Sequence, residues 1–97
     1  MWPPHPGAGV LALQPPAPNP PVAAGTRIQL TGVARGVRGV VVQERTQGRP
    51  WTQLRSIVPA PTTGAFHFAV APSATTDYRL ATAQDAAAFI RIRVQPG

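Results

Sequence analysis

The sequence predicts an all-β sandwich of seven short antiparallel strands, and three observations support this. Apolar and polar residues alternate over short segments, as they do in half-buried strands. Pro and Gly separate these segments at intervals of about 8–14 residues. Only residues 82–88 have a helix-forming composition, and they are few and lack an apolar repeat of 3.6 residues, so we expect a hairpin loop there. A small barrel is the alternative architecture.

The first part of the chain is rich in Pro and is expected to lie partly outside the sandwich. Residues 1–8 include three Pro, which favour an extended tail or linker ahead of a sandwich domain spanning residues 9–97. The apolar run Val10–Leu13 has Pro-rich segments on both sides, which is typical of an edge strand. We expect it to pair within its own sheet. The alternative is that it pairs with a second copy of the chain and forms a homo-oligomer.

Six later segments show the alternation and complete the set of strands. They are residues 26–31, 40–45, 51–57, 64–70, 76–81 and 89–94. Their inward residues are expected to be Ile28, Leu30, Val40, Val42, Phe66, Phe68, Val70, Tyr78, Leu80, Ile90, Ile92 and Val94. The glycines of residues 32–39 indicate a turn region.

Two aromatic residues are expected to have structural roles. Trp51 begins a strand and is expected to close the edge of the core. Tyr78 lies near the start of the penultimate strand, where sandwich folds often use a Tyr whose hydroxyl bonds to nearby backbone.

The composition excludes much of enzyme chemistry. The 97 residues contain no Cys and no Lys, which removes disulfides, thiolate metal sites, Schiff bases and a P-loop lysine. His67 alternates outward with no second ligand near it in sequence, so we expect no metal site. No nucleophile elbow or phosphate-binding glycine motif occurs. We therefore expect no catalytic residues and no cofactor, and a chain that is not an enzyme.

The charge is strongly basic and entirely due to arginine. Nine Arg oppose three acids, for a net charge of +6. This suits a polyanion partner, but the Arg are scattered, and a GC-rich coding sequence also replaces Lys with Arg. No run of 18 apolar residues occurs, so no membrane insertion is expected.

One sheet face is predicted to gather many of these charges. If the last two strands pair with residues 40–45, the outer face collects Val41, Arg45, Arg79, Phe89, Arg91 and Arg93. Guanidinium planes beside an aromatic ring bind anions or pack on another domain. We expect a protein domain or an acidic glycan as partner, rather than nucleic acid, because base stacking needs several aromatics. The alternative is a solvated face whose Arg stems cover apolar atoms.

The order of motifs resembles the immunoglobulin-like β-sandwich modules of bacterial, especially actinobacterial, surface and secreted proteins. The matching segments are residues 25–28, 40–45, 51–54, 64–70, 75–79 and 90–94, within a stretch of roughly residues 9–95. The chain differs from antibody domains in lacking their Cys pair. The resemblance implies a seven-stranded immunoglobulin-like sandwich that acts as a stalk, spacer or recognition module without catalysis.

We therefore expect a non-enzymatic structural or adhesion module that contacts a partner through a sheet face. One alternative is a subunit of a surface assembly, such as a virion decoration or pilus-like protein. Another is a binder of acidic glycan or nucleic acid through the Arg-rich face. No secretory signal is visible, so the chain is either cytosolic or a fragment or mature segment of a longer protein. We favour the second alternative and expect an extracellular or surface-exposed location.

Overall fold

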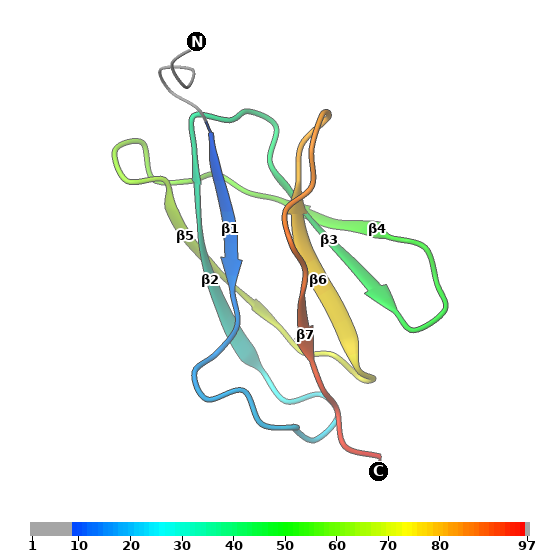
Figure 1. Ribbon diagram of the computed structural model, residues 1–97. Coiled ribbons are helices and arrows are strands. Elements are labelled where there is room, and N and C mark those ends of the chain that lie inside the picture. The colour runs from blue at the N-terminus through cyan, green and yellow to red at the C-terminus, as the bar shows by residue number, and fades with distance from the viewer. Residues whose placement is uncertain (1–8, 97) are drawn as a thin grey trace, which may run out of the picture.

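The structure, a computed structural model, describes residues 9–96 and has seven strands in two antiparallel sheets (Figure 1). The strands are β1 (Val10–Gln14), β2 (Ile28–Arg35), β3 (Val41–Thr46), β4 (Thr52–Ser56), β5 (Ala65–Val70), β6 (Thr76–Ala81) and β7 (Ile90–Ile92). One sheet has the order β1-β2-β5 and the other β4-β3-β6-β7. The expected tail, residues 1–8, lies outside the described residues.

The predicted all-β architecture is confirmed. No helix occurs within residues 9–96, so none there is long and apolar enough to cross a membrane. Residues 82–88 form a loop between β6 and β7, closed by an isolated bridge between Ala81 and Ala86. The first strand pairs within its own sheet, as expected, with Val10 opposite Arg35 of β2.

The core lies between the two sheets and is built from their alternating inward residues. Five large side chains are at most 2% exposed, namely Leu30, Val42, Tyr78, Leu80 and Ile92. The predicted alternation holds in β5, where Phe68 and Val70 are buried while His67 faces solvent. Burying apolar side chains stabilises a fold by about 1.5–3 kcal/mol each, so this two-sided core stabilises the sandwich without a disulfide.

The second strand is longer than predicted. It continues through the expected glycine turn to Arg35, and the turn follows at residues 36–39. Gly32 is buried in the middle of β2, where a Cβ would lie 2.5 Å from both the Phe66 ring and the Ala12 carbonyl oxygen. This glycine therefore permits close packing and does not form a turn.

The last strand is shorter than predicted. It ends at Ile92, and Val94 forms a parallel bridge with Val22. Val22 donates its N–H to the Arg93 carbonyl at 2.9 Å and accepts from the N–H of Gln95 at 2.7 Å. The N-terminal segment therefore pairs with both sheets, since β1 pairs with β2 and Val22 pairs beside the chain that follows β7.

Candidate functional site

Three charged residues lie opposite one another on the outer face of the four-stranded sheet. Arg45 of β3 is opposite Asp77 of β6, and Asp77 is opposite Arg91 of β7. Arg91 donates from Nε to one carboxylate oxygen at 2.7 Å and from Nη2 to the other at 3.2 Å. Arg45 donates from Nε to the second oxygen at 3.2 Å. Sheet register alone thus brings two cations onto one carboxylate.

The two arginines cover Asp77 and neutralise it. Asp77 is only 6% exposed although it lies on the solvent side of the sheet. Hydrogen bonds from Arg91 and then Arg45 keep the pKa of Asp77 below its usual value, although burial acts in the opposite direction. The same carboxylate raises the pKa of Arg91. Because Arg45 and Arg91 share one carboxylate, one of their two positive charges has no counterion among these three residues.

Guanidinium groups stack on two aromatic rings on this face. The Trp51 ring has the Arg79 guanidinium carbon 4.2 Å and the Arg45 guanidinium carbon 4.3 Å from its centroid. The Phe89 ring has Arg45 at 5.2 Å and Arg91 at 5.6 Å. The two rings are 6.2 Å apart and inclined by 55°. We call these five residues, Arg79, Trp51, Arg45, Phe89 and Arg91, the ladder.

The ladder holds its guanidinium groups in place and leaves donors free for a ligand. Arg79 donates from Nε to Gln43 Oε1 at 2.7 Å, and Arg45 uses only its Nε on Asp77. Among residues 9–96, the Nη groups of Arg79 and Arg45 donate no hydrogen bond within the protein. Phe89 is 45% exposed, so the face combines apolar area with free N–H donors.

Trp51 is not where the sequence predicted it. It does not close the core edge but stacks on the outer face. The cause is a bulge, because the register between β3 and β4 shifts between Val42 and Gln43. Past this shift, Gln53 lies opposite Gln43 on the outer face, and Trp51 is two residues further along the same side. The aromatic centre of the site was therefore missed from the sequence.

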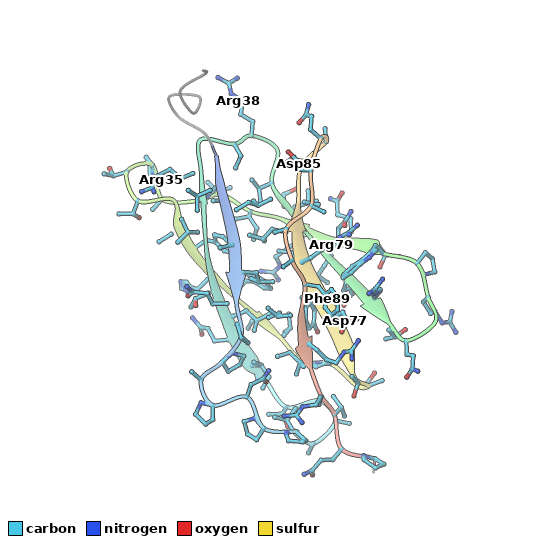
Figure 2. All side chains as sticks on the ribbon, in the orientation of Figure 1. Arg35, Arg38, Asp77, Arg79, Asp85 and Phe89 are labelled. Carbon is cyan, nitrogen blue, oxygen red and sulfur yellow. The ribbon has the colours of Figure 1, made fainter. Side chains whose placement is uncertain are left out.

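The structure brings together four of the six residues predicted for the contact face. Arg45, Arg79, Phe89 and Arg91 belong to the ladder. Figure 2 shows Arg79, Phe89 and Asp77 close together beside β6 and β7.

The other two predicted residues lie at the margins. Val41 is on the same face, opposite Ala81, four residues before Arg45 on β3. Arg93 follows β7, and its Nη2 donates to the Asn19 carbonyl at 2.8 Å, which directs it to the segment before β2.

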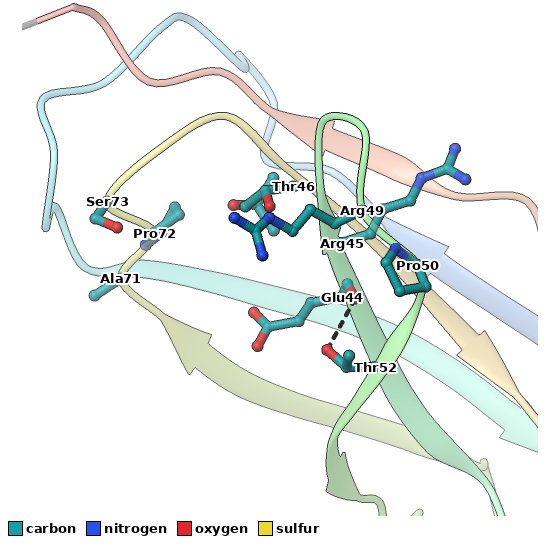
Figure 3. A pocket seen from close by; sticks show the side chains of 10 residues that line it. Glu44, Arg45, Thr46, Arg49, Pro50, Thr52, Ala71, Pro72 and Ser73 are labelled. Carbon is teal, nitrogen blue, oxygen red and sulfur yellow. Dashed lines mark hydrogen bonds between the residues drawn. The ribbon is translucent and has the colours of Figure 1, made fainter.

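A second feature lies on the inner side of β4. Two adjoining hollows of about 470 and 260 Å³ open between β3–β4 and the loop after β5, and both are lined by Glu44, Ala71 and Pro72. Figure 3 shows the Glu44 carboxylate facing into the larger hollow.

Tyr78 lines the floor of the smaller hollow. Burial, and then the negative charge of Glu44, raises the pKa of Tyr78 to about 12. Among residues 9–96 its hydroxyl makes no hydrogen bond to backbone, so the partner that we expected is not found, and the nearby Thr76 hydroxyl donates to the Ala74 carbonyl at 2.7 Å.

No metal centre is found in the part of the chain that the structure describes. Within residues 9–96 no three His, Cys, Asp or Glu side chains are grouped as a metal site would require. His67 lies on the outer face of the three-stranded sheet, where its Nδ1 is 2.9 Å from Gln29 Nε2.

Comparisons with protein-family models, with curated proteins and with solved structures find no match to this chain. Its function is therefore proposed from the residues of the ladder and their setting.

Proposed function

We propose that this chain is an immunoglobulin-like β-sandwich module, without enzymatic activity, that contacts a partner through the ladder. The strand order supports the immunoglobulin-like assignment. In constant-type immunoglobulin domains the first, second, fourth and fifth strands form one sheet and the others form the second. Here the fourth strand lies beside the third instead, and the other six keep that division. In line with the resemblance, we propose an extracellular or surface-exposed location.

The observation that carries the proposal is the fixed and accessible state of the Arg side chains. A solvated Arg loses rotamer entropy when it binds a ligand. The ladder guanidinium groups are already stacked on Trp51 and Phe89, each within 6 Å of a ring centroid. Binding therefore orders fewer side-chain torsions than binding to a flexible basic surface would. This favours a contact face over a merely solvated one.

A polyanion is the second candidate partner, and the charge balance favours it. The ladder carries three guanidinium groups against the single carboxylate of Asp77, within a chain of net charge +6. A polyanion releases its counterions when such groups neutralise it, so its affinity falls steeply with salt. A protein partner with an acidic patch shows a smaller dependence on salt.

NMR titration with two anionic probes, heparin oligosaccharide and polyglutamate, tests the proposal. The Arg Nε–Hε signals of the ladder and the Trp51 indole signal are expected to shift on addition of either probe. Arg79→Gln should weaken binding by about tenfold, since it removes a charge-assisted contact.

Arg38→Gln is the matched control. It removes the same charge from an exposed turn. Figure 2 shows that Arg38 lies at one end of the molecule, away from Arg79. Equal losses in the Arg79 and Arg38 variants, or no binding of either probe, contradict the proposed contact face. A steeper salt dependence with heparin than with polyglutamate favours the polyanion partner.

A further inference from the structure

The β4 strand leaves one of its edges open. Within residues 9–96 it pairs only with β3, and all five of its residues are exposed. Such an edge presents unpaired N–H and C=O groups that template another strand. Of the features that protect sheet edges, Pro is absent from Thr52–Ser56, and the charged Arg55 reaches inward to within 5.7 Å of the Phe68 ring, so that only the bulge beside Leu54 remains. In Figure 1, β4 extends away from the rest of the sandwich, so its outer edge is approachable.

The two sides of this edge differ in chemistry. The hollows on the inner side have mixed walls, in which Leu54, Ala71 and Pro72 lie beside Glu44 and Arg55, and Leu54 is 37% exposed. The outer side carries Trp51 with the Arg79 guanidinium stacked on it. The long side chain of Arg79 therefore extends from β6 toward β4 and brings positive charge to its outer side.

A strand added beside β4 would meet these two environments with alternate side chains. Successive side chains of a strand point to opposite faces of its sheet. Every second residue would lie next to Trp51 and Arg79, where an acidic group gains a charge-assisted hydrogen bond. The residues between them would lie over Leu54 and Pro72, where a small apolar group is favoured.

We propose that β4 accepts an extended segment of a partner protein as a fifth strand of its sheet, with acidic and apolar residues alternating along that segment. The acidic half of this inference rests on the proposed function of the ladder, whereas the backbone pairing does not. Main-chain hydrogen bonds supply the affinity and the two environments supply the specificity, as in other complexes formed by strand addition.

Labelled peptides of about ten residues provide the test, by fluorescence anisotropy. The probe alternates glutamate and valine, and a control peptide has the same composition with the two residue types in separate blocks. The alternating peptide should bind about tenfold more tightly than the block peptide. Equal affinity for the two overturns the proposed alternation.

N-methylation of the peptide separates strand addition from simple charge attraction. Two further probes carry methyl groups on alternate amides, in the two opposite phases. In the antiparallel pairing, which is the more stable one, only one phase points its amides at β4, so one probe should lose about tenfold in affinity and the other should bind like the parent. If both bind like the parent while Arg79→Gln still weakens binding, strand addition is wrong and the proposed contact face survives. If N-methylation matters and Arg79→Gln does not, β4 accepts a strand but the role of the ladder is wrong.

A pair of protein variants completes the design. Leu54→Glu places a negative charge at the middle of β4 and should weaken the acidic peptide by at least about tenfold. Val58→Glu is the control, since Val58 is 92% exposed and lies beyond the end of β4. Thermal melts of both variants confirm that they fold. If heparin oligosaccharide competes with the alternating peptide and neither N-methylation phase has an effect, the face binds anions in general, and the inference fails.

Discussion

Replacing Asp77 with Asn is expected to destabilise the fold by about 2–3 kcal/mol, because it removes the carboxylate that two arginines cover. Asn keeps one carbonyl acceptor of the same shape. It also turns an NH2 group toward guanidinium N–H donors that previously met an oxygen, either Arg91 Nε, which is 2.7 Å from Oδ1, or Arg91 Nη2 and Arg45 Nε, which are each 3.2 Å from Oδ2. Donor then faces donor at a site that is 6% exposed.

The expected loss of stability follows from the number of hydrogen bonds to Asp77 and from the solvent exposure of the arginines that donate them. Hydrogen bonds to charged groups contribute about 1.5–3 kcal/mol each. The side chains of Arg91 and Arg45 are 55% and 33% exposed, so solvent screens much of their interaction with Asp77. The three hydrogen bonds therefore contribute less than three times the value of one. A net loss of about 2–3 kcal/mol corresponds to a fall in Tm of about 8–24 °C for a domain of this size.

The effect depends on pH in a defined direction. The folded-state pKa of Asp77 lies below its ordinary value, so the unfolded chain takes up the proton first as pH falls. The stabilisation is complete well above pH about 4 and is lost as pH falls through the folded-state pKa. The Tm difference between the wild type and Asp77→Asn should therefore be full at neutral pH and shrink toward pH about 2.

Thermal melts followed by circular dichroism across this pH range provide the assay. Asp85→Asn is the matched control, because Asp85 is an exposed loop acid and its loss changes net charge by the same amount. The reasoning fails if the two variants have equal Tm at neutral pH. It also fails if the deficit of Asp77→Asn is the same at pH about 2 as at pH about 7.

Two further predictions concern the backbone and the core. Gly64→Ala should lower the free energy of unfolding, measured in urea, by several kcal/mol more than Gly48→Ala does. Both glycines have positive φ, but only at Gly64 would a Cβ clash, because it would lie 2.6 Å from the Ala34 carbonyl oxygen. Equal costs would show that the clash relaxes. Tyr78 is the sole tyrosine, so absorbance titration should give one midpoint near 12 in the folded protein and about 10 in denaturant, with stability falling as pH rises between them. A folded midpoint near 10 would mean that the hydroxyl is hydrated.

The strands and their faces could be predicted because the pattern is local. In β6, the inward residues Tyr78 and Leu80 are apolar and Arg79 between them is charged, so two-residue alternation defines the face. The pairing of β6 with both β3 and β7 then places Arg45 and Arg91 on that same face. A single sequence thus contains enough information to collect most of the charged residues of the site.

The burial of Asp77 could not be predicted in this way. Alternation correctly places it on the solvent side, where an acid is ordinarily hydrated. It becomes buried only because residues 32 positions before and 14 positions after it lie directly opposite in register. The number of residues between two strands does not determine which residues pair across them, so this contact exists only once the sheet is assembled.

Trp51 shows how a single irregularity changes the chemistry of a face. With uninterrupted alternation, Trp51, Gln53 and Arg55 would share one side of β4. The bulge opposite Val42 and Gln43 divides them, so that Arg55 reaches inward to within 5.7 Å of the Phe68 ring while Gln53 and Trp51 lie outward. Neither Gly nor Pro occurs in Thr52–Ser56 to indicate a bulge.

The bulge also explains why the ladder is more than a charged surface. Without Trp51 on the outer side, Arg79 and Arg45 would be two like charges on neighbouring strands with no ring to stack on. Both guanidinium carbons lie within 4.3 Å of the Trp51 ring centroid, and the ring attracts them through its negative π-density. The guanidinium groups can then keep close and fixed positions while their Nη donors remain available. The bulge that places Trp51 on the outer side therefore also organises the cations beside β4, which is why we assign partner binding to this side of the molecule.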